Sequence, residues 1–234
     1  MSTISNMAKY TKISPQHSKR THAIDTITIH CFVGEVKAFN GVEYFSSTNA
    51  AVRRCSANYV VGVDGSIGCA VPEDLRSWCS SDQQNDDRAV TIEVASKTYD
   101  PYKVSDAAYR SLIVLVADIC KRNGIKKLVW SDNKDDRVNH RNGCNMTVHR
   151  DYAAKACPGE YLYTRMATIA EEVNKIITDT KETAWSQMAK DWAVKNGLIS
   201  GYGNGYYGWS DNLTREQLAV VLYRFWIMMG GKTE

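Results

Sequence analysis

The sequence predicts a mixed α/β domain followed by a small all-helical unit. Short segments in which apolar and polar residues alternate, as they do in strands, are separated by longer segments with helical periodicity. After residue 178 the pattern changes to two helical segments joined by a glycine- and aromatic-rich stretch. A length of 234 residues suits one domain of ordinary size with such an appendage.

Three segments have the pattern of strands. Residues 24–30 alternate and end at His30, and residues 59–63 are stopped by a turn dipeptide, Asp-Gly. Residues 90–95 alternate most clearly, and this alternation puts Glu93 on the face opposite the apolar residues. We assign His30 to the same face as Glu93.

The helices of the first domain are predicted from periodicity and caps. Residues 48–55 can form a short helix with a threonine cap, and residues 105–123 form a longer one between a serine cap and Gly124. A final helix begins near residue 158. Residues 131–147 are polar and rich in turn residues, which predicts a loop.

A polar stretch at residues 178–183 predicts a linker, and therefore two domains, 1–178 and 179–234. In the second, residues 185–195 form a helix, and another helix begins at Thr214 with a glutamine three positions later, as in a capping box. This helix–loop–helix unit is too small to bury both apolar faces alone. We expect it to pack on the first domain or on copies of itself.

Composition excludes several classes of protein. A net charge of +3 without a Lys/Arg stripe argues against nucleic acid as a partner. No apolar run is long enough for membrane insertion, and no apolar signal segment opens the sequence. The seven cysteines have irregular spacing, which predicts reduced thiols rather than a disulfide framework.

Three residues are natural zinc ligands. His30 ends a strand, His149 follows the polar loop, and Cys157 comes eight residues later, before a helix. Zinc binds imidazole nitrogen and thiolate sulfur, and three protein ligands leave a position for water in a catalytic site. From the spacing alone, a polar histidine and a buried cysteine without any metal remain an open alternative.

Four segments resemble the zinc amidases that cleave N-acetylmuramoyl-L-alanine bonds, a family that includes phage lysozyme-type amidases and peptidoglycan recognition proteins. The segments are ITIHC around His30, the strand from Tyr59, VTIEVAS around Glu93, and VHRDYAAKACPGEYL at 148–162. The resemblance implies a central mixed sheet flanked by helices, with zinc in a surface groove. It also implies that His30, His149 and Cys157 are the metal ligands.

The same resemblance suggests roles for three further residues. Glu93 is the candidate general base and acid, Lys155 the candidate cation beside the developing oxyanion, and Tyr59 the candidate groove residue near the metal. The alternatives are an exposed strand glutamate, a solvated loop lysine and a tyrosine that only packs. The sequence departs from many relatives at Cys79, where they have histidine.

Two residues near the predicted ligands are ambiguous. His140 lies in the polar loop, and we interpret it as a loop residue rather than a ligand. Asp151 follows His149 and can either orient that ligand by a hydrogen bond or form a structural salt bridge.

The C-terminal unit resembles one S-layer homology repeat, through WAVKNGLISGYGNGYYGWSDNLTREQLAVVLYRF. The resemblance implies attachment to a secondary polymer of Gram-positive cell walls, with Arg215 and Trp209 as candidate wall-binding residues. Such repeats commonly work in threes and one is visible here, which suggests self-association or a weak anchor. A merely packed extension is the alternative.

The leading prediction is an endolysin-type zinc amidase that acts on bacterial peptidoglycan. Without a signal segment, we expect the protein to stay in the host cytoplasm until its release to the wall. The alternative is a non-catalytic peptidoglycan-binding protein on the same fold, against which Cys157, Lys155 and Glu93 together argue. A thiol enzyme that uses Cys157 with His149 fits less well, because it leaves His30 without a role.

Overall fold

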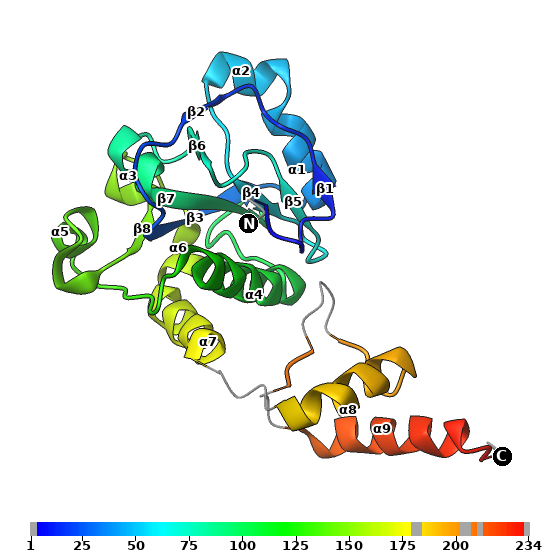
Figure 1. Cartoon of the computed structure of the whole chain (residues 1–234). Helices are drawn as coiled ribbons and strands as arrows, with labels where there is room; N and C mark the ends of the chain where they lie inside the picture. Colours follow the sequence, from blue (N-terminus) through cyan, green and yellow to red (C-terminus); the bar gives the residue numbers. More distant parts are fainter. Residues whose placement is uncertain (1–3, 179–183, 202–206, 210–212, 232–234) are drawn as a thin grey trace. The chain divides into compact units, whose positions relative to one another are not determined.

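The computed structural model describes residues 4–178, 184–201, 207–209 and 213–231 (Figure 1). The chain divides into two compact units, residues 1–178 and 179–234. The described helices do not include one with the length and hydropathy needed to cross a membrane.

The first unit is built on a mixed sheet of six strands in the order β1-β5-β4-β7-β3-β8. The two long central strands β3 and β7 pair in parallel, β8 and β4 run parallel to them on either side, and β5 is antiparallel to β4. A separate ribbon pairs β2 with β6. The strand bounds are β1 Tyr10–Thr11, β2 His17–Lys19, β3 Thr26–Val33, β4 Tyr59–Val61, β5 Ile67–Cys69, β6 Leu75–Ser77, β7 Ala89–Ser96 and β8 Met146–Val148.

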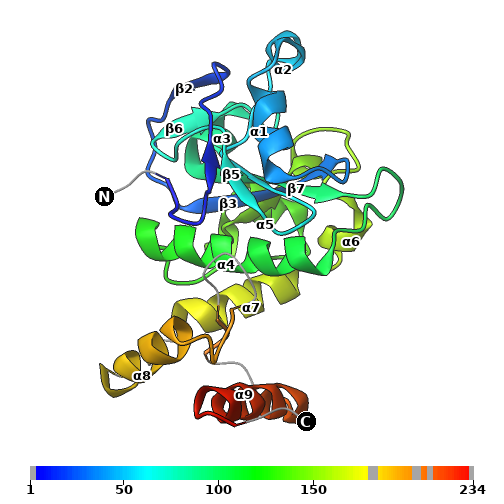
Figure 2. The same ribbon diagram turned by 90° about the vertical axis from the view of Figure 1, so that its right-hand side faces the viewer.

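Helices cover the sheet, which confirms the predicted mixed α/β architecture. Helices α4 and α7 pack together on one side of it (Figures 1 and 2). Helices α1 and α2 pack against each other, and α1 contacts β4 and β5. The helix bounds are α1 Ala38–Phe45, α2 Thr48–Arg53, α3 Gln83–Arg88, α4 Asp106–Asn123, α5 Lys134–Val138, α6 Gly159–Tyr163 and α7 Met166–Thr178, with 3₁₀ turns η1 Arg141–Gly143 and η2 His149–Asp151.

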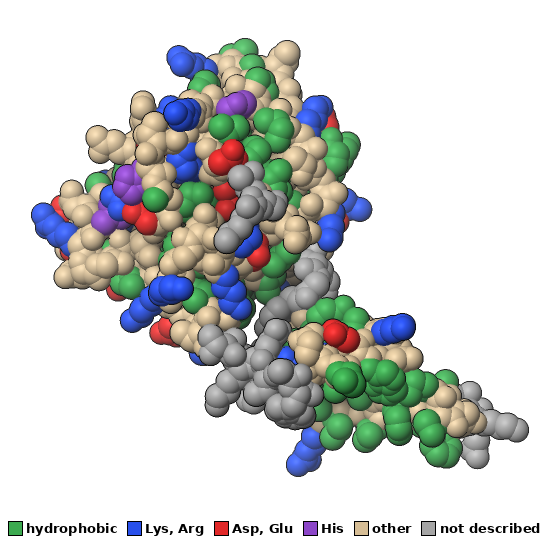
Figure 3. Space-filling view, in the orientation of Figure 1, with side chains coloured by type: hydrophobic (Ala, Val, Ile, Leu, Met, Phe, Trp, Pro, Cys, Tyr) green, Lys and Arg blue, Asp and Glu red, His purple; other side chains and the backbone are tan. Residues whose placement is uncertain are grey.

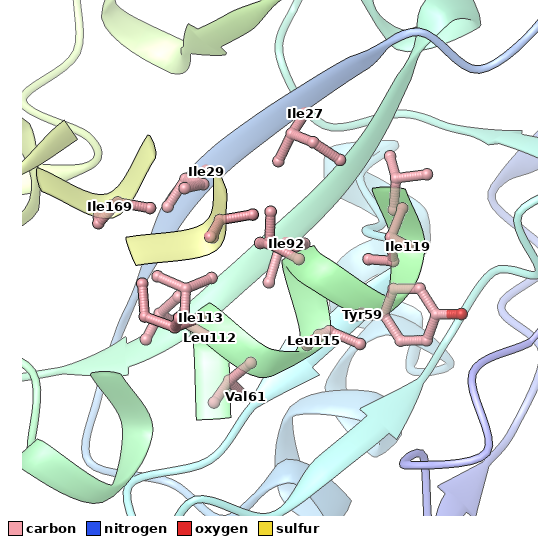
Figure 4. Close-up of a cluster of buried hydrophobic side chains, with 14 of the residues drawn as sticks. Ile27, Ile29, Tyr59, Val61, Ile92, Leu112, Ile113, Leu115, Ile119 and Ile169 are labelled. Atoms are coloured by element: carbon pink, nitrogen blue, oxygen red, sulfur yellow. The ribbon is translucent and has the colours of Figure 1, made fainter. Parts of the chain in front are cut away.

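The two faces of the sheet differ in chemistry. The face toward α4 and α7 is apolar, and the side chains drawn in Figure 4 interlock there to form the main core. On the opposite face, the buried side chains of β3, β7 and β8 are small or polar: Thr26, Thr28, His30, Ala89, Thr91, Ala95 and Thr147. Toward α1, Val60 of β4 belongs to a second, smaller hydrophobic cluster with Val42 and Phe45. Burial in the main core and in this smaller cluster supplies the hydrophobic stabilisation of the unit. The second face is therefore free to carry hydrogen-bonding and ligand side chains.

The predicted strands and the long helix are confirmed with small shifts at their ends. The β3 strand runs on to Val33, and β4 ends at Val61. At the start of α4, Ser105 Oγ accepts a hydrogen bond of 3.0 Å from the backbone N–H of Ala108. At its end, Gly124 adopts the left-handed conformation with φ 74°.

The segment 131–147 is more ordered than the predicted loop, because it contains α5, η1 and β8. Its centre is Arg137, whose fully buried guanidinium pairs with Asp151 at 2.6 Å. Arg137 also donates to the carbonyl of Ser131 at 2.7 Å and lies 4.4 Å from the Trp130 ring. The contacts of one buried arginine thus order this segment. Because they are polar and long-range, the sequence shows no periodic hydrophobic pattern here.

Two other predictions need correction at helix ends. The cap of α2 is Ser47, whose side chain accepts a hydrogen bond from the backbone N–H of Ala50, so the helix begins one residue earlier than a Thr48 cap implies. The predicted final helix is two helices, α6 and α7. Between them the backbone N–H of Arg165 bonds the carbonyl of Leu162 at 2.9 Å, a tightened turn that ends α6.

The second unit contains α8 Ala184–Lys195 and α9 Arg215–Met228. The predicted capping box is present, since Thr214 and Gln217 exchange hydrogen bonds of 2.9 and 3.1 Å. Figure 3 shows hydrophobic side chains gathered on this unit. The exposed large apolar residues of α9 are Leu218, Val220, Leu222, Tyr223, Phe225, Trp226, Ile227 and Met228. The predicted linker at 178–183 lies, after Thr178, outside the described residues.

The buried ion pair yields a stability prediction. Replacing Arg137 by Met leaves the Asp151 carboxylate buried without its partner, and we expect the free energy of unfolding to fall by about 3–5 kcal/mol. The matched control is Arg141→Met, which removes an exposed ion pair with Asp135 in the same segment and costs less than about 1 kcal/mol. Urea unfolding of both variants checks this, and equal losses would contradict the role given to Arg137.

Candidate metal centre

Strand register brings the two predicted histidine ligands together. His30 lies on β3, and Ile29 of that strand pairs with Val148 of β8. His149 comes immediately after β8, so it emerges beside His30 although the two are far apart in sequence. Their ring centroids lie 5.1 Å apart with the rings edge to face.

The third predicted ligand reaches the same point from the loop before α6. Cys157 Sγ lies 3.5 Å from His30 Nδ1 and accepts a hydrogen bond of 3.3 Å from the backbone N–H of Cys31. Arg150 holds this loop, because its backbone N–H bonds the Cys157 carbonyl at 3.2 Å and its side chain bonds the Ala156 carbonyl at 2.5 Å.

These three side chains fit a zinc ion. One ligand atom from each of His30, His149 and Cys157 lies within 4.8 Å of the other two. Tetrahedral zinc with bonds of about 2.0–2.1 Å to nitrogen and about 2.3 Å to sulfur places nitrogen and sulfur roughly 3.6 Å apart. The spacing between His30 Nδ1 and Cys157 Sγ, 3.5 Å, agrees with that value.

The other ring nitrogen of His30 is a separate observation, because the 3.5 Å spacing involves Nδ1. Within the described residues, His30 Nε2 is buried and has no hydrogen-bond partner. Such an atom is costly unless another group satisfies it. Burial, and then nearby His149, lowers the pKa of His30 well below its usual value. Burial, and then Lys155, lowers the pKa of His149. Both rings are therefore neutral near pH 7, which is the form that binds a metal.

Cys157 differs, because a thiolate must be formed before it can bind zinc. A hydrogen bond with the Cys31 side chain, and then burial, raises the pKa of Cys157 well above its usual value. A cation at this position reverses that preference, since a coordinating thiol gives up its proton.

Glu93 lies next to this cluster, as strand alternation predicts. It pairs with His30 in the parallel register of β3 and β7, so both side chains leave the sheet on the same face. Its Oε1 lies 3.8 Å from Cys79 Sγ, and its buried Oε2 has no hydrogen-bond partner among the described residues. Burial raises the pKa of Glu93 to about 7. A carboxyl group with this pKa can exchange a proton near neutral pH.

Lys155 is exposed and lies in the loop between His149 and Cys157. It is close enough for its positive charge to lower the pKa of His149. The loop thus brings a cation to the edge of the cluster.

The structure corrects the prediction for Tyr59. This residue pairs with Ile92, whose side chain is in the apolar core, and Tyr59 is itself fully buried there. Its hydroxyl donates to Glu73 Oε1 at 2.5 Å and accepts from the backbone N–H of Ser5 at 2.8 Å. Tyr59 therefore faces away from His30 and stabilises the opposite side of the sheet.

The sequence left two roles open for Asp151, and the structure shows that it forms the salt bridge. Its Oδ1 pairs with Arg137, and its Oδ2 also accepts from the backbone N–H of Val148 at 3.1 Å. These bonds fix the turn η2, where His149 begins. His140 belongs to neither group of potential metal ligands found among the described residues, and its Nδ1 lies 3.2 Å from the Cys144 carbonyl.

Sequence reasoning missed two neighbours of the cluster. Ser81 Oγ lies 3.1 Å from His149 Nε2, and Cys79 contacts Glu93. Both residues sit between β6 and α3, where Asp86 accepts hydrogen bonds from the backbone N–H groups of Cys79 and Ser80. Ser81 and His149 are 68 residues apart, so their contact leaves no local pattern in the sequence. The one signal nearby is Cys79, where many relatives have histidine.

In the second unit, Trp209 and Arg215 occupy different settings. Trp209 stacks on Tyr207 with ring centroids 5.5 Å apart, and Lys190 Nζ lies 5.5 Å from its ring. These residues line an open groove together with Asp191 and others of α8. Arg215 is the exposed first residue of α9 and is not among the groove-lining residues.

Comparison with known proteins gives two family matches. The family described as N-acetylmuramoyl-L-alanine amidase matches residues 20–160. The S-layer homology domain matches residues 177–219. No curated protein matches the chain.

Solved structures share the fold of the first unit at low sequence identity. A selenomethionine derivative of AmpD is 21% identical with a TM-score of 0.53, over 73% of this chain and 98% of that one. A mutant endolysin from Bacillus subtilis is 14% identical with a TM-score of 0.52, over 70% and 97%. The PlyG catalytic domain is 18% identical with a TM-score of 0.51, over 74% and 97%.

The position of Tyr59 yields a prediction that separates packing from a role at the metal. We expect Tyr59→Phe to lower the free energy of unfolding by about 1–3 kcal/mol, because the buried Glu73 carboxylate loses a donor. Zinc affinity should stay within a factor of about two, since the hydroxyl lies on the other face. Urea unfolding and a competitive zinc titration measure the two effects. Weaker zinc binding at unchanged stability would contradict this placement.

Proposed function

Because this chain belongs to the N-acetylmuramoyl-L-alanine amidase family, we propose that it is a zinc-dependent enzyme that hydrolyses the amide bond between N-acetylmuramic acid and L-alanine in bacterial peptidoglycan. The observation that carries the proposal is the convergence of His30, His149 and Cys157 beside Glu93. Two imidazoles and a thiolate leave a fourth zinc position for water, as in catalytic sites.

His30, His149 and Cys157 would hold the metal, and Glu93 and Lys155 would supply proton transfer and charge. Bound zinc polarises a carbonyl and lowers the pKa of a water molecule to about 7. Glu93 accepts the proton from the attacking water and returns it to the departing amine. Its pKa of about 7 suits both steps near neutral pH.

Lys155 provides positive charge at the edge of the cluster. Amide hydrolysis concentrates negative charge on the carbonyl oxygen, and a nearby cation stabilises that charge. Since Lys155 is exposed and lies in the loop before Cys157, its side chain can approach a substrate without displacing the ligands.

Two other functions are less well supported. A protein that only binds peptidoglycan has no need for a carboxyl group such as Glu93, with a pKa of about 7, next to a thiol and a histidine. A thiol enzyme needs a cysteine with a lowered pKa, whereas the pKa of Cys157 is raised.

For the second unit we propose attachment to a secondary polymer of the Gram-positive cell wall. The S-layer homology match and the groove that joins Lys190 with Trp209 support this role. Arg215 adds an exposed cation on α9. We also propose that exposed apolar side chains of α9 allow self-association, which would multiply weak wall contacts by avidity.

We propose an endolysin-type role in cell-wall lysis, in which the protein is kept in the host cytoplasm until it is released to the wall. The family match to peptidoglycan amidases is consistent with this role. Fractionation of lysing host cells tests it, because the protein should stay with the cytoplasmic fraction until lysis begins.

The catalytic proposal is tested on purified cell wall with Glu93→Gln. We expect wild type to release free amino groups without new reducing sugar ends. The variant should lose about 10²–10⁴-fold in rate while it keeps its zinc, because only the proton shuttle is removed. The matched control, Glu35→Gln, changes an exposed glutamate paired with Lys97 and should keep full activity. New reducing ends, or full activity of Glu93→Gln, would overturn the proposal.

The wall-binding proposal is tested by sedimentation of the full chain with purified Gram-positive wall. Trp209→Ala removes the ring that lines the groove, and we expect the dissociation constant to rise about 5- to 30-fold, as for a contact worth about 1–2 kcal/mol. Trp192→Ala is the control, since this partly exposed tryptophan of α8 is not among the groove-lining residues. Equal effects of the two variants would argue against the groove as the binding site.

A further inference from the structure

A second group of ligand-type side chains lies directly beside the first. One ligand atom each from His30, Cys79 and Glu93 lies within 4.8 Å of the other two. His30 belongs to both groups, whereas Cys79 and Glu93 take no part in the first. The chain therefore offers two overlapping sets of zinc-binding atoms on the same face of the sheet.

Three separate parts of the fold position the second set. His30 and Glu93 face each other across the parallel pair β3 and β7. Cys79 enters from the loop after β6, where Asp86 accepts from its backbone N–H at 2.8 Å and from that of Ser80 at 3.1 Å. These bonds hold the thiol 3.8 Å from Glu93 Oε1.

The second set contains two unsatisfied buried atoms. Among the described residues, three buried side-chain atoms have no hydrogen-bond partner, and two of them are His30 Nε2 and Glu93 Oε2. An unpaired buried acceptor destabilises the fold, and a cation bound between these groups would offset that cost.

The chemistry of this set also suits zinc. Imidazole nitrogen, thiolate sulfur and carboxylate oxygen are all common zinc ligands. With bonds of about 2.0–2.2 Å to oxygen and about 2.3 Å to sulfur, tetrahedral zinc holds sulfur and oxygen roughly 3.6 Å apart. The observed spacing between Cys79 Sγ and Glu93 Oε1 is 3.8 Å.

We propose that His30, Cys79 and Glu93 form an alternative zinc site that shares His30 with the proposed catalytic site. In this arrangement a single ion occupies one set at a time, and His30 serves either set. When the ion moves to the second set, the Cys79 thiol gives up its proton together with any proton on Glu93, and the Cys157 thiolate, no longer coordinated, takes up a proton. Glu93 is then a metal ligand and cannot accept a proton, so this state is inactive.

The inference rests on the proposed zinc centre and is tested separately from it with Cys157→Ser, which disables the first set. Cadmium serves as the probe, because a cadmium–thiolate bond gives a charge-transfer absorbance that reports sulfur ligation without any activity assay. We expect Cys157→Ser to bind one equivalent of cadmium with a thiolate band. Adding Cys79→Ser should abolish that band and weaken binding at least about tenfold.

Two controls keep the result interpretable. Cys55→Ser in the Cys157→Ser background removes a partly exposed thiol outside both sets, and should leave the band intact. Circular dichroism of the metal-free variants checks that each one folds, so a lost band reports a lost ligand.

The outcomes separate the two claims. Absence of a thiolate band in folded Cys157→Ser, or a band that survives the loss of Cys79, overturns the alternative site. The single variant Cys79→Ser reports on the first set, and it should keep a thiolate band from Cys157. Loss of the band in that variant contradicts the proposed catalytic ligands instead.

Discussion

The parallel register of β3 with its two neighbours is the constraint on which the site depends. It sets His30 opposite Glu93 on one side and carries the chain from Val148 into His149 on the other. A shift of one residue would send His30 into the apolar core, because side chains alternate between the faces of a sheet. Packing of the apolar core on one face of the sheet therefore also fixes which side chains, including His30, lie on the other face.

The support around the ligands is polar and specific. The buried pair between Arg137 and Asp151 fixes η2 through the Val148 backbone, and Asp86 fixes the loop that carries Cys79. A buried ion pair adds little net stability, but it is expensive to break and holds a unique geometry. The hydrophobic face stabilises the fold, and these polar contacts position the groups that do chemistry.

Sequence alone predicted the parts that have a local pattern. Alternation put Glu93 on the face of His30, and caps marked the long helix at Ser105 and Gly124. Tyr59 was misplaced because its position came from the family resemblance alone. Since β4 is buried on both faces, its three residues show no alternation that could correct the direction. The order of segment 131–147 and the contacts of Ser81 and Cys79 depend on long-range ion pairs and hydrogen bonds. These leave no periodic signal in the chain.

The most direct measurement of the central claim is zinc X-ray absorption on the wild-type protein loaded with one equivalent of zinc. With His30, His149 and Cys157 as ligands, the spectrum should show four-coordinate zinc with two imidazoles, one sulfur at about 2.3 Å and one further oxygen. A spectrum without sulfur, or with six oxygen and nitrogen neighbours, would contradict the account.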